Sequence, residues 1–202
     1  MIIDFISDLH GYTPKLQGGD LLIIAGDLTG RDTKLEYDRF LAWLNPLPYR
    51  CKIVIAGNHD GLLEKGLTLQ GENLIYLCDT GTEFEGLKIW GSPYTPTFFD
   101  WHFMRDRGAP IKKHWDLIPA HTDILVTHGP PNRILDLTED KIHAGCEELT
   151  KAVQALKPRI HCFGHIHEGG GRTEEIDGVT YINCSYVNER YRPVHGAIRK
   201  II

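Results

Sequence analysis

The chain has 202 residues, of which 42% are apolar and 24% are charged, and its formal net charge is −5. This composition excludes a disordered, collagen-like or coiled-coil protein, and the length suits a single folded domain over residues 1–202. The longest apolar runs are far shorter than the roughly 20 residues that span a bilayer, and no signal-peptide pattern precedes the first polar motif. We therefore expect a cytoplasmic protein with no membrane partner, and the acidic balance predicts no stable nucleic-acid binding.

Short apolar runs rich in Ile, Val and Leu recur along the chain and are typical of buried β-strands. Their ranges are 2–7, 21–25, 52–56, 123–127 and 159–163. Helical periodicity predicts helices over 33–44 and 145–156, which Pro46 and Pro158 bring to an end. The early part of the chain therefore alternates strands with helices.

Two later segments have the pattern of β-hairpins. The first joins 75–78 to 84–90 with a turn near Glu85-Gly86, and the second joins 172–176 to 179–184 at Asp177-Gly178. Because such a mixture of elements buries its apolar faces in layers, we expect an α/β fold, called α+β in some schemes. The predicted architecture is a four-layer α-β-β-α sandwich, with two mixed β-sheets flanked by helices.

Polar side chains that bind metals follow each of the five predicted strands. They are Asp8, His10, Asp27, Asn58, His128, His165 and His167. The carboxyl ends of parallel strands lie along one edge of a sheet, so these residues are expected to converge in space. One divalent ion takes four to six ligands, and seven candidates therefore favour two ions, with the carboxylate of Asp27 as the bridge.

These strand ends also carry a series of five motifs that resembles the signature of the calcineurin-like metallophosphoesterases. The motifs are Asp8-Leu9-His10, Gly26-Asp27, Gly57-Asn58-His59-Asp60, Thr127-His128-Gly129 and Gly164-His165-Ile166-His167. Further stretches over 91–103 and 128–169 are similar to the metallophosphoesterase-domain-containing branch, a cyclic-nucleotide-phosphodiesterase-like group.

The resemblance implies how the candidate ligands divide between the two ions. One ion would take Asp8, His10, Asp27 and His167, and the other would take Asp27, Asn58, His128 and His165. His59 then remains as a non-ligand histidine that faces the substrate. Mixed imidazole and carboxylate sets accept several transition metals, so we expect Mn, with Fe, Zn, Co or Ni as alternatives.

The resemblance implies metal-dependent phosphoester hydrolysis, and the expected substrates are small phosphodiesters such as cyclic nucleotides. A hydroxide shared by the two ions would attack phosphorus, and His59 would protonate the leaving oxygen as general acid. One alternative is a nuclease-type or broad-specificity phosphatase of the same superfamily, and another is a metal-bound, non-catalytic scaffold. No oligomeric partner is implied by the sequence.

Serine/threonine protein phosphatases carry an aspartate three residues after the bridging aspartate, where it pairs with the catalytic histidine. This sequence has Gly30 at that place, so the expectation is that Asp60 or Asp32 orients His59 instead.

Substrate contacts are expected from the long loops. Tyr94, Arg133 and His143 are the candidates, and Arg107 also lies on a loop that could reach a substrate. Aromatic residues between 94 and 103 would either stack on a base or pack into the core.

Overall fold

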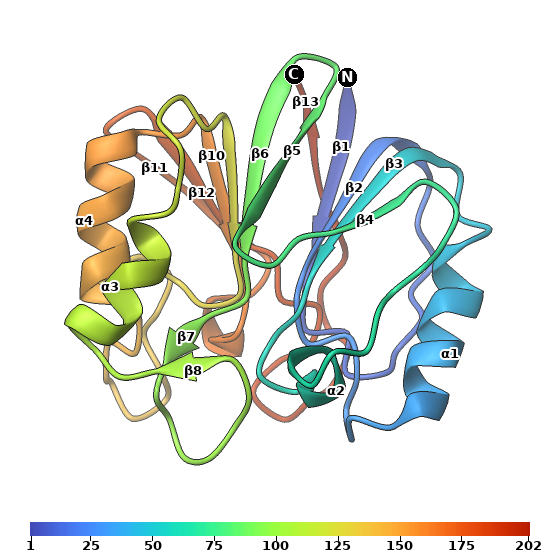
Figure 1. Cartoon of the computed structure of the whole chain (residues 1–202), viewed down its shortest axis with the longest axis horizontal. Coiled ribbons are helices and arrows are strands. Elements are labelled where there is room, and N and C mark those ends of the chain that lie inside the picture. The colour runs from blue at the N-terminus through green and yellow to red at the C-terminus, as the bar shows by residue number, and fades with distance from the viewer.

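Two mixed β-sheets pack face to face, and helices lie against the outer face of each sheet (Figure 1). The computed structural model describes residues 1–202. The first sheet has the strand order β13-β1-β2-β3-β4, in which the outer strand β13 is antiparallel to β1 and the other neighbours are parallel. Its strands are β1 (Ile2–Ile6), β2 (Gly19–Ala25), β3 (Tyr49–Ile55), β4 (Leu74–Tyr76) and β13 (Ile198–Ile201).

The second sheet has the order β11-β12-β10-β9-β6-β5, with three parallel pairs at its centre and an antiparallel hairpin at each edge. Its strands are β5 (Thr80–Phe84), β6 (Leu87–Ser92), β9 (Ile124–Thr127), β10 (Ile160–Phe163), β11 (Arg172–Ile176) and β12 (Val179–Asn183). A separate parallel pair, β7 (Thr95–Pro96) and β8 (Met104–Arg105), lies in the long loop after β6.

The helices are few and short. They are α1 (Lys34–Leu44), α2 (Gly61–Glu64), α3 (Ala109–Trp115), α4 (Glu147–Leu156) and the 3₁₀ helix η1 (His167–Gly169). The longest, α1, begins at a capping box, because the Thr33 side chain accepts from the Glu36 backbone and the Glu36 side chain accepts in return. Helix α4 begins with two glutamates, a favourable charge at the positive end of the helix dipole.

Three apolar clusters hold the layers together. The largest lies between the sheets and takes residues from both, among them Phe5 and Ile53 from the first sheet and Ile89 and Val126 from the second. A second cluster joins the other face of the first sheet to α1, and a third joins the outer face of the second sheet to α3 and α4. These three interfaces are the contacts of a four-layer α-β-β-α sandwich, so the predicted fold class is confirmed.

The predicted elements are largely confirmed, with one correction. All five apolar runs are strands, and both predicted helices are present as α1 and α4. The hairpin at Asp177-Gly178 is also confirmed, with both turn residues at positive φ. The assignment of residues 75–78 to the first hairpin is wrong, because β4 pairs in parallel with β3 in the other sheet. The strand that turns at Glu85-Gly86 onto β6 is β5, whose polar residues hid it from hydrophobic patterning.

The carboxyl ends of the central strands of both sheets meet at one edge of the sandwich. Just beyond β1, the backbone of Ser7 donates to Cys184 and accepts from Tyr186, which follow β12 in the other sheet. The sequence expectation that strand ends converge therefore extends across both sheets. No helix in the structure combines the length and the apolar character needed to cross a membrane.

Candidate metal centre

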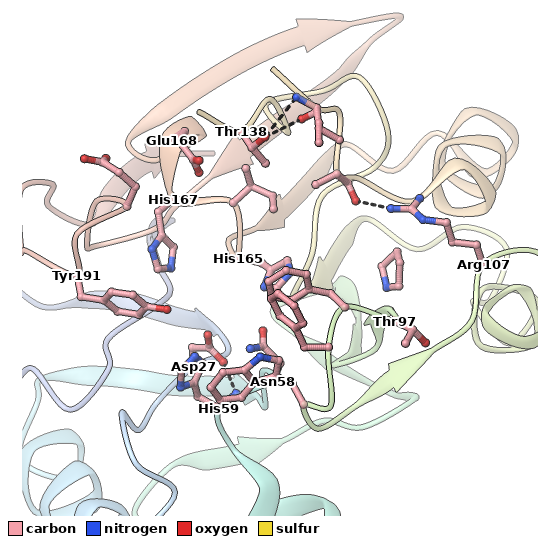
Figure 2. Close-up of a pocket in the computed structure, with 18 residues that line it drawn as sticks. Asp27, Asn58, His59, Thr97, Arg107, Thr138, His165, His167, Glu168 and Tyr191 are labelled. Carbon is pink, nitrogen blue, oxygen red and sulfur yellow. Dashed lines mark hydrogen bonds between the residues drawn. The ribbon is translucent and has the colours of Figure 1, made fainter. Parts of the chain in front are cut away.

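Seven polar residues, each one to four positions beyond a strand, gather where the two sheets meet. They are Asp8, His10, Asp27, Asn58, His128, His165 and His167, the set expected from the sequence. Figure 2 shows four of them, Asp27, Asn58, His165 and His167, around the floor of one cavity. The structure thus brings together side chains up to 159 positions apart in the chain.

The carboxylate of Asp27 lies at the centre of the group and is buried. Its Oδ2 is 3.6 Å from Nε2 of His10, while its Oδ1 is 3.4 Å from Nε2 of His128. The two oxygens of one carboxylate therefore face two different histidines. This is the arrangement needed by a carboxylate that serves two neighbouring ions.

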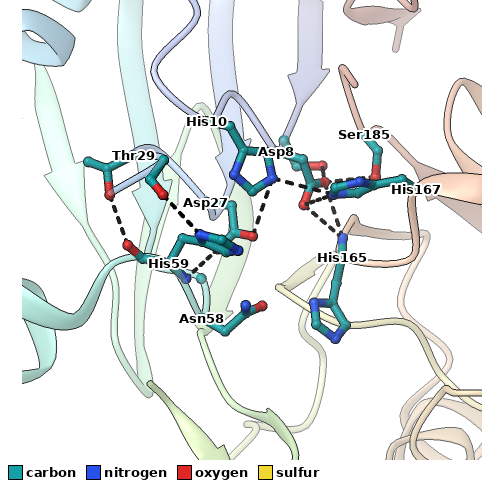
Figure 3. A network of polar contacts seen from close by, with 12 residues as sticks. Asp8, His10, Asp27, Thr29, Asn58, His59, His165, His167 and Ser185 are labelled. Atoms are coloured by element: carbon teal, nitrogen blue, oxygen red, sulfur yellow. Dashed lines mark hydrogen bonds and ion pairs between the residues drawn. The ribbon is translucent and has the colours of Figure 1, made fainter. Parts of the chain in front are cut away.

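The first half of the group comes from β1 and β10 (Figure 3). Oδ1 of Asp8 lies 3.3 Å from Nε2 of His167, and the Nε2 atoms of His10 and His167 are 3.4 Å apart. One ligand atom from each of these three residues lies within 4.8 Å of the other two. Two imidazole nitrogens and a carboxylate oxygen at such spacing form a donor set suited to a transition-metal ion.

The second half comes from β3, β9 and β10. Nε2 of His128 lies 2.9 Å from Oδ1 of Asn58, and the ring centroids of His128 and His165 are 5.0 Å apart. Nδ1 of His128 is 2.9 Å from the carbonyl oxygen of Ala25, which can only accept, so Nδ1 is the donor in this contact. This contact orients the ring so that Nε2 of His128 points to Asn58 and Asp27, where it could serve as a ligand.

A further set of hydrogen bonds fixes the orientation of Asp8. The hydroxyls of Ser7 and Ser185 donate to Oδ2 of Asp8 at 2.5 and 2.7 Å, and the backbone N–H of His165 donates to Oδ1 at 3.0 Å. The ring of His167 is held in a similar way, because its Nδ1 lies 3.1 Å from the carbonyl oxygen of Asn188. Such outer contacts preset the geometry of metal ligands.

The backbone is strained at four of the candidate ligands. Asp8, His10, Asp27 and His165 have φ values between 43° and 68°, a left-handed conformation that residues with a side chain rarely adopt. Gly164 makes room beside them, since a Cβ at this position would lie 2.0 Å from Oδ2 of Asp8. Strain of this kind persists where surrounding contacts over-determine the conformation, and it concentrates at functional sites.

Burial and mutual charge shift the pKa values of the cluster in opposite directions. Burial lowers the pKa of His165 to about 3, and the charge of His128 acts in the same sense. For His128, burial also lowers the pKa, but the charge of Asp27 outweighs it and raises the value to about 9. The carboxylate of Asp27 is held well below its usual pKa because His128 offsets its burial. The centre therefore favours an ionised carboxylate beside positive charge.

His59 lies at the edge of the cluster and lines the cavity. Its Nδ1 is 3.4 Å from the carbonyl oxygen of Gly30, and no carboxylate bonds to its ring. The expectation that Asp60 or Asp32 orients His59 is wrong. Asp60 accepts backbone N–H bonds from Leu28, Thr29 and Gly57, and Asp32 is bonded to Tyr37 and Leu62.

The cavity above the cluster has a volume of about 620 Å³ and is lined by 18 residues. Phe98, Phe99 and Trp101 form part of its wall, together with Tyr191 from the loop after β12. The imidazole of His59 lies against the indole of Trp101, with ring centroids 4.4 Å apart. The cavity is therefore continuous with the cluster, and four aromatic side chains form part of its lining.

Three of the four sequence-predicted substrate contacts, Tyr94, Arg133 and His143, do not line this cavity. Tyr94 stacks on His114 with ring centroids 3.6 Å apart, the backbone N–H of exposed Arg133 donates to Asp136, and Nδ1 of His143 is 2.6 Å from the same aspartate. Arg107 does line the cavity. The aromatic residues between 94 and 103 have two different roles. Phe98, Phe99 and Trp101 line the cavity, whereas Phe103 is buried in the core.

Several residues around the centre were not expected from the sequence. Ser185, Glu168, Glu189 and Tyr191 come from segments after the last recognised motif or at its end. Tyr191 is notable because its ring centroid lies 4.8 Å from that of His10 and 5.3 Å from that of His167. No local sequence pattern points to Tyr191. Its unusual backbone, with a φ of 56°, is visible only in the structure.

Comparisons with known proteins agree with this geometry. The model of the calcineurin-like phosphoesterase family matches residues 1–169. Human metallophosphoesterase domain-containing protein 1 is 39% identical over 224 aligned residues, which cover 96% of this chain and 68% of the human protein. A UPF0046 protein of Caenorhabditis elegans is 36% identical, with coverage of 98% of this chain and 78% of that protein.

Among solved structures, the phosphopantetheinyl hydrolase of Mycobacterium tuberculosis shares the fold, with a TM-score of 0.59 at 15% identity over 94% of this chain and 90% of that one. The five strand-end motifs, the convergent aspartates and histidines, and the match over most of the chain lead to one conclusion. The chain belongs to the calcineurin-like phosphoesterase family and is a hydrolase of phosphoric ester bonds.

Proposed function

We propose that the chain is a dinuclear metal-dependent phosphodiesterase that acts on small phosphodiesters, the class that includes cyclic nucleotides. The observation that carries the proposal is the division of Asp27, whose Oδ1 faces His128 and whose Oδ2 faces His10. In this proposal one ion is held by Asp8, His10, Asp27 and His167, and the other by Asp27, Asn58, His128 and His165. Bound there, divalent ions supply an activated water at neutral pH and neutralise phosphoryl oxygens.

The chain's own residues contribute orientation and a proton. His59 holds a proton for the leaving oxygen, because its Nδ1 faces the carbonyl of Gly30 and its Nε2 is left for the substrate side. The indole of Trp101 limits rotation of the imidazole by lying against it. Tyr191 packs edge to face against His10 and His167 and limits the rotation of both rings.

The charges around the cavity favour a diester over a monoester. Arg107 is the only lysine or arginine among the lining residues, and its guanidinium is engaged by the carboxylate of Glu147 and the carbonyls of Ala144 and Gly145. Glu168 and Glu189 line the cavity and add negative charge. A monoester dianion carries more negative charge than a diester and would be opposed more strongly.

The alternatives receive less support. A nuclease that holds a nucleic-acid strand needs basic surface, whereas the chain has a net charge of −5 and a cavity rim with two glutamates. A broad-specificity phosphatase must also bind monoester dianions, which the two glutamates of the cavity would repel. A non-catalytic scaffold has no reason to retain seven converging ligands, His59 and a cavity above them. We also place the chain in the cytoplasm, in keeping with its five free cysteines.

The test is hydrolysis of bis-p-nitrophenyl phosphate beside p-nitrophenyl phosphate. Protein is stripped with a chelator and reloaded with Mn²⁺, and separately with Fe²⁺, Zn²⁺, Co²⁺ or Ni²⁺, and the metal content is measured as ions per chain. We expect two ions per chain and metal-dependent turnover of the diester. Asp27→Asn should lose both, while Asp38→Asn, an exposed change on α1, should lose neither.

Two results would count against the proposal. Preference for the monoester would point to a phosphatase with the same metal centre. Absence of turnover with every metal, in protein that holds two ions per chain, would favour the scaffold.

A further inference from the structure

The outer part of the cavity is built from exposed aromatic rings. Phe98, Phe99, Trp101 and Tyr191 line it and are between 41% and 79% exposed. Large rings are normally buried in a core, so a group of them around an open cavity indicates a surface that binds something. Because the rings surround the entrance to the metal centre, their ligand is a part of the substrate beyond the phosphate.

Two carboxylates lie among these rings. Glu168 follows the candidate ligand His167, and Glu189 precedes Tyr191 by two positions, and all four line the cavity. In Figure 2, Glu168 lies on the same side of the cavity as His167 and Tyr191, across from Arg107. Oε1 of Glu168 accepts the backbone N–H of Glu139 at 2.9 Å, which fixes the position of the carboxylate.

No side chain of the cavity neutralises these two charges. Arg107 already has partners in Glu147 and two backbone carbonyls. Glu189 pairs with Arg190, whose Nε lies 3.6 Å from Oε1. The Arg190 side chain is 72% exposed, and an ion pair so open to water contributes little. The subsite therefore has negative charge and aromatic faces to offer, and lacks a cation of its own.

We propose that this outer subsite binds an organic ammonium group carried by the phosphodiester substrate. Aromatic faces attract cations, quaternary ammonium groups above all, and nearby carboxylates add a direct charge attraction. A zwitterionic diester would place its phosphate at the metal centre and its ammonium group between Trp101, Tyr191, Glu168 and Glu189. This inference rests on the proposed phosphodiesterase function and names the substrate class.

Two probes that differ in one charge test the inference. p-Nitrophenyl phosphorylcholine carries a trimethylammonium group, and p-nitrophenyl 3,3-dimethylbutyl phosphate has the same shape with carbon in place of nitrogen. Both release p-nitrophenolate. We expect kcat/KM of the Mn²⁺-loaded enzyme to favour the charged probe by about tenfold, a preference that declines with ionic strength.

Variants assign the preference to the two glutamates. Glu168→Gln and Glu189→Gln should each reduce the ratio of the two kcat/KM values, and the double variant should bring it close to one. Glu175→Gln removes the same charge from an exposed position on β11, outside the cavity, and should leave the ratio unchanged.

A binding measurement gives a readout that does not depend on turnover. Choline and 3,3-dimethylbutanol are each titrated into chelator-stripped protein and followed by ligand-observed NMR. Choline should bind more tightly to the wild-type chain, and the double variant should lose the difference.

The outcomes separate this inference from the proposed function. Equal kcat/KM for the two probes would overturn the ammonium subsite, as would a preference for cyclic nucleotides that neither glutamate affects, while the diesterase proposal would stand in both cases. Selective choline binding by a protein that hydrolyses no diester would support the subsite and reject the phosphodiesterase.

Discussion

The imidazole of His59 lies against the indole of Trp101, with ring centroids 4.4 Å apart and ring planes inclined by 33°. The same imidazole turns its Nδ1 toward the carbonyl oxygen of Gly30, at 3.4 Å. A backbone carbonyl and an aromatic ring therefore orient this imidazole, and no carboxylate is hydrogen-bonded to it. The carboxylate of Asp27 also lies near this ring, with an oxygen within 4.8 Å of a ring nitrogen of His59.

Replacing His59 with Asn should leave metal binding intact and slow the hydrolysis of diesters with poor leaving groups. A general acid typically contributes 10² to 10⁴ in rate, and p-nitrophenolate needs little help to leave. We expect a loss of about that size in kcat for an alkyl diester and a much smaller loss for bis-p-nitrophenyl phosphate. Metal content per chain is the control, and equal losses on both substrates would contradict a role as general acid.

The contact between the rings of Trp101 and His59 should contribute to kcat by holding the imidazole in position. Trp101→Leu removes the aromatic face, so the imidazole gains rotational freedom and kcat for the alkyl diester should decrease by about tenfold. Trp101→Phe keeps an aromatic face and should retain most of the rate. If the Leu and Phe variants are equally impaired in kcat, the contact has no positioning role.

A methyl group at Gly164 should disturb the metal centre directly. The added Cβ would lie 2.0 Å from Oδ2 of Asp8 and 2.1 Å from Oγ of Ser7, and neither neighbour is the free end of a flexible side chain. Gly164→Ala should weaken metal binding by about 10- to 100-fold, the range found when groups that orient ligands are lost. Metal titration of the stripped protein measures this.

Gly196→Ala is the matched control for that change. A Cβ at Gly196 meets nothing within 4 Å, so metal affinity should be unaffected. Wild-type affinity in Gly164→Ala would show that Asp8 can shift without cost, and that its hydrogen bonds to Ser7 and Ser185 do not preset the site.

The sequence was informative where its pattern reports burial and chain direction. Apolar runs such as residues 21–25 could be assigned to buried strands, and strand direction then placed Asp27 and Asn58 at a common edge. β13 was not expected because two of its four residues are charged and it pairs with β1 about 195 positions away. No local pattern encodes a partner so distant in the chain.

The contacts that orient the histidines of the site could not be predicted from the sequence either. The groups that hold His59, His128 and His167 are backbone carbonyls, and every residue has one. Which carbonyl faces a ring depends on the packing of two sheets against each other. Side-chain chemistry could therefore nominate the ligands, whereas their orientation depended on tertiary contacts alone.

The edge strand β13 is joined to β1 by hydrogen bonds between the side chains of Arg199 and Asp4. Asp4 is 3% exposed and accepts from Nε and Nη2 of Arg199 at 2.8 and 2.7 Å, and also from the hydroxyl of Tyr49. Asp4→Asn removes the charge and places an amide NH₂ group against the N–H donors of Arg199. The free energy of unfolding should therefore decrease by about 2 kcal/mol. Chemical denaturation measures the change.

The surface pair between Lys34 and Asp38 provides the comparison for Asp4. Both side chains are more than half exposed, and Asp38→Asn should change stability by less than about 0.5 kcal/mol. A loss in Asp4→Asn no greater than in Asp38→Asn would mean that water replaces the Arg199 contact without cost.

The buried side chain of His161, on strand β10, should make stability depend on pH. His161 is fully buried, its Nε2 lies 2.8 Å from Oγ1 of Thr127, and its Nδ1 has no partner. Burial lowers the pKa of His161 to about 3 from an ordinary value of 6.5. Between these two values the unfolded chain binds a proton that the folded chain does not, so stability decreases as the pH falls from 6.5 toward 3.

In His161→Gln, unfolding no longer exposes an imidazole that takes up a proton. The glutamine amide can still hydrogen-bond to Thr127. The stability of this variant should therefore decline less steeply with falling pH than that of the wild type, by up to about 1.4 kcal/mol per pH unit. Urea denaturation of chelator-stripped protein between pH 4 and 7 measures both slopes, and His121→Gln, an exposed change, is the matched control. Parallel slopes for wild type and His161→Gln would mean that the imidazole gains its proton in the folded state, through a water that reaches Nδ1.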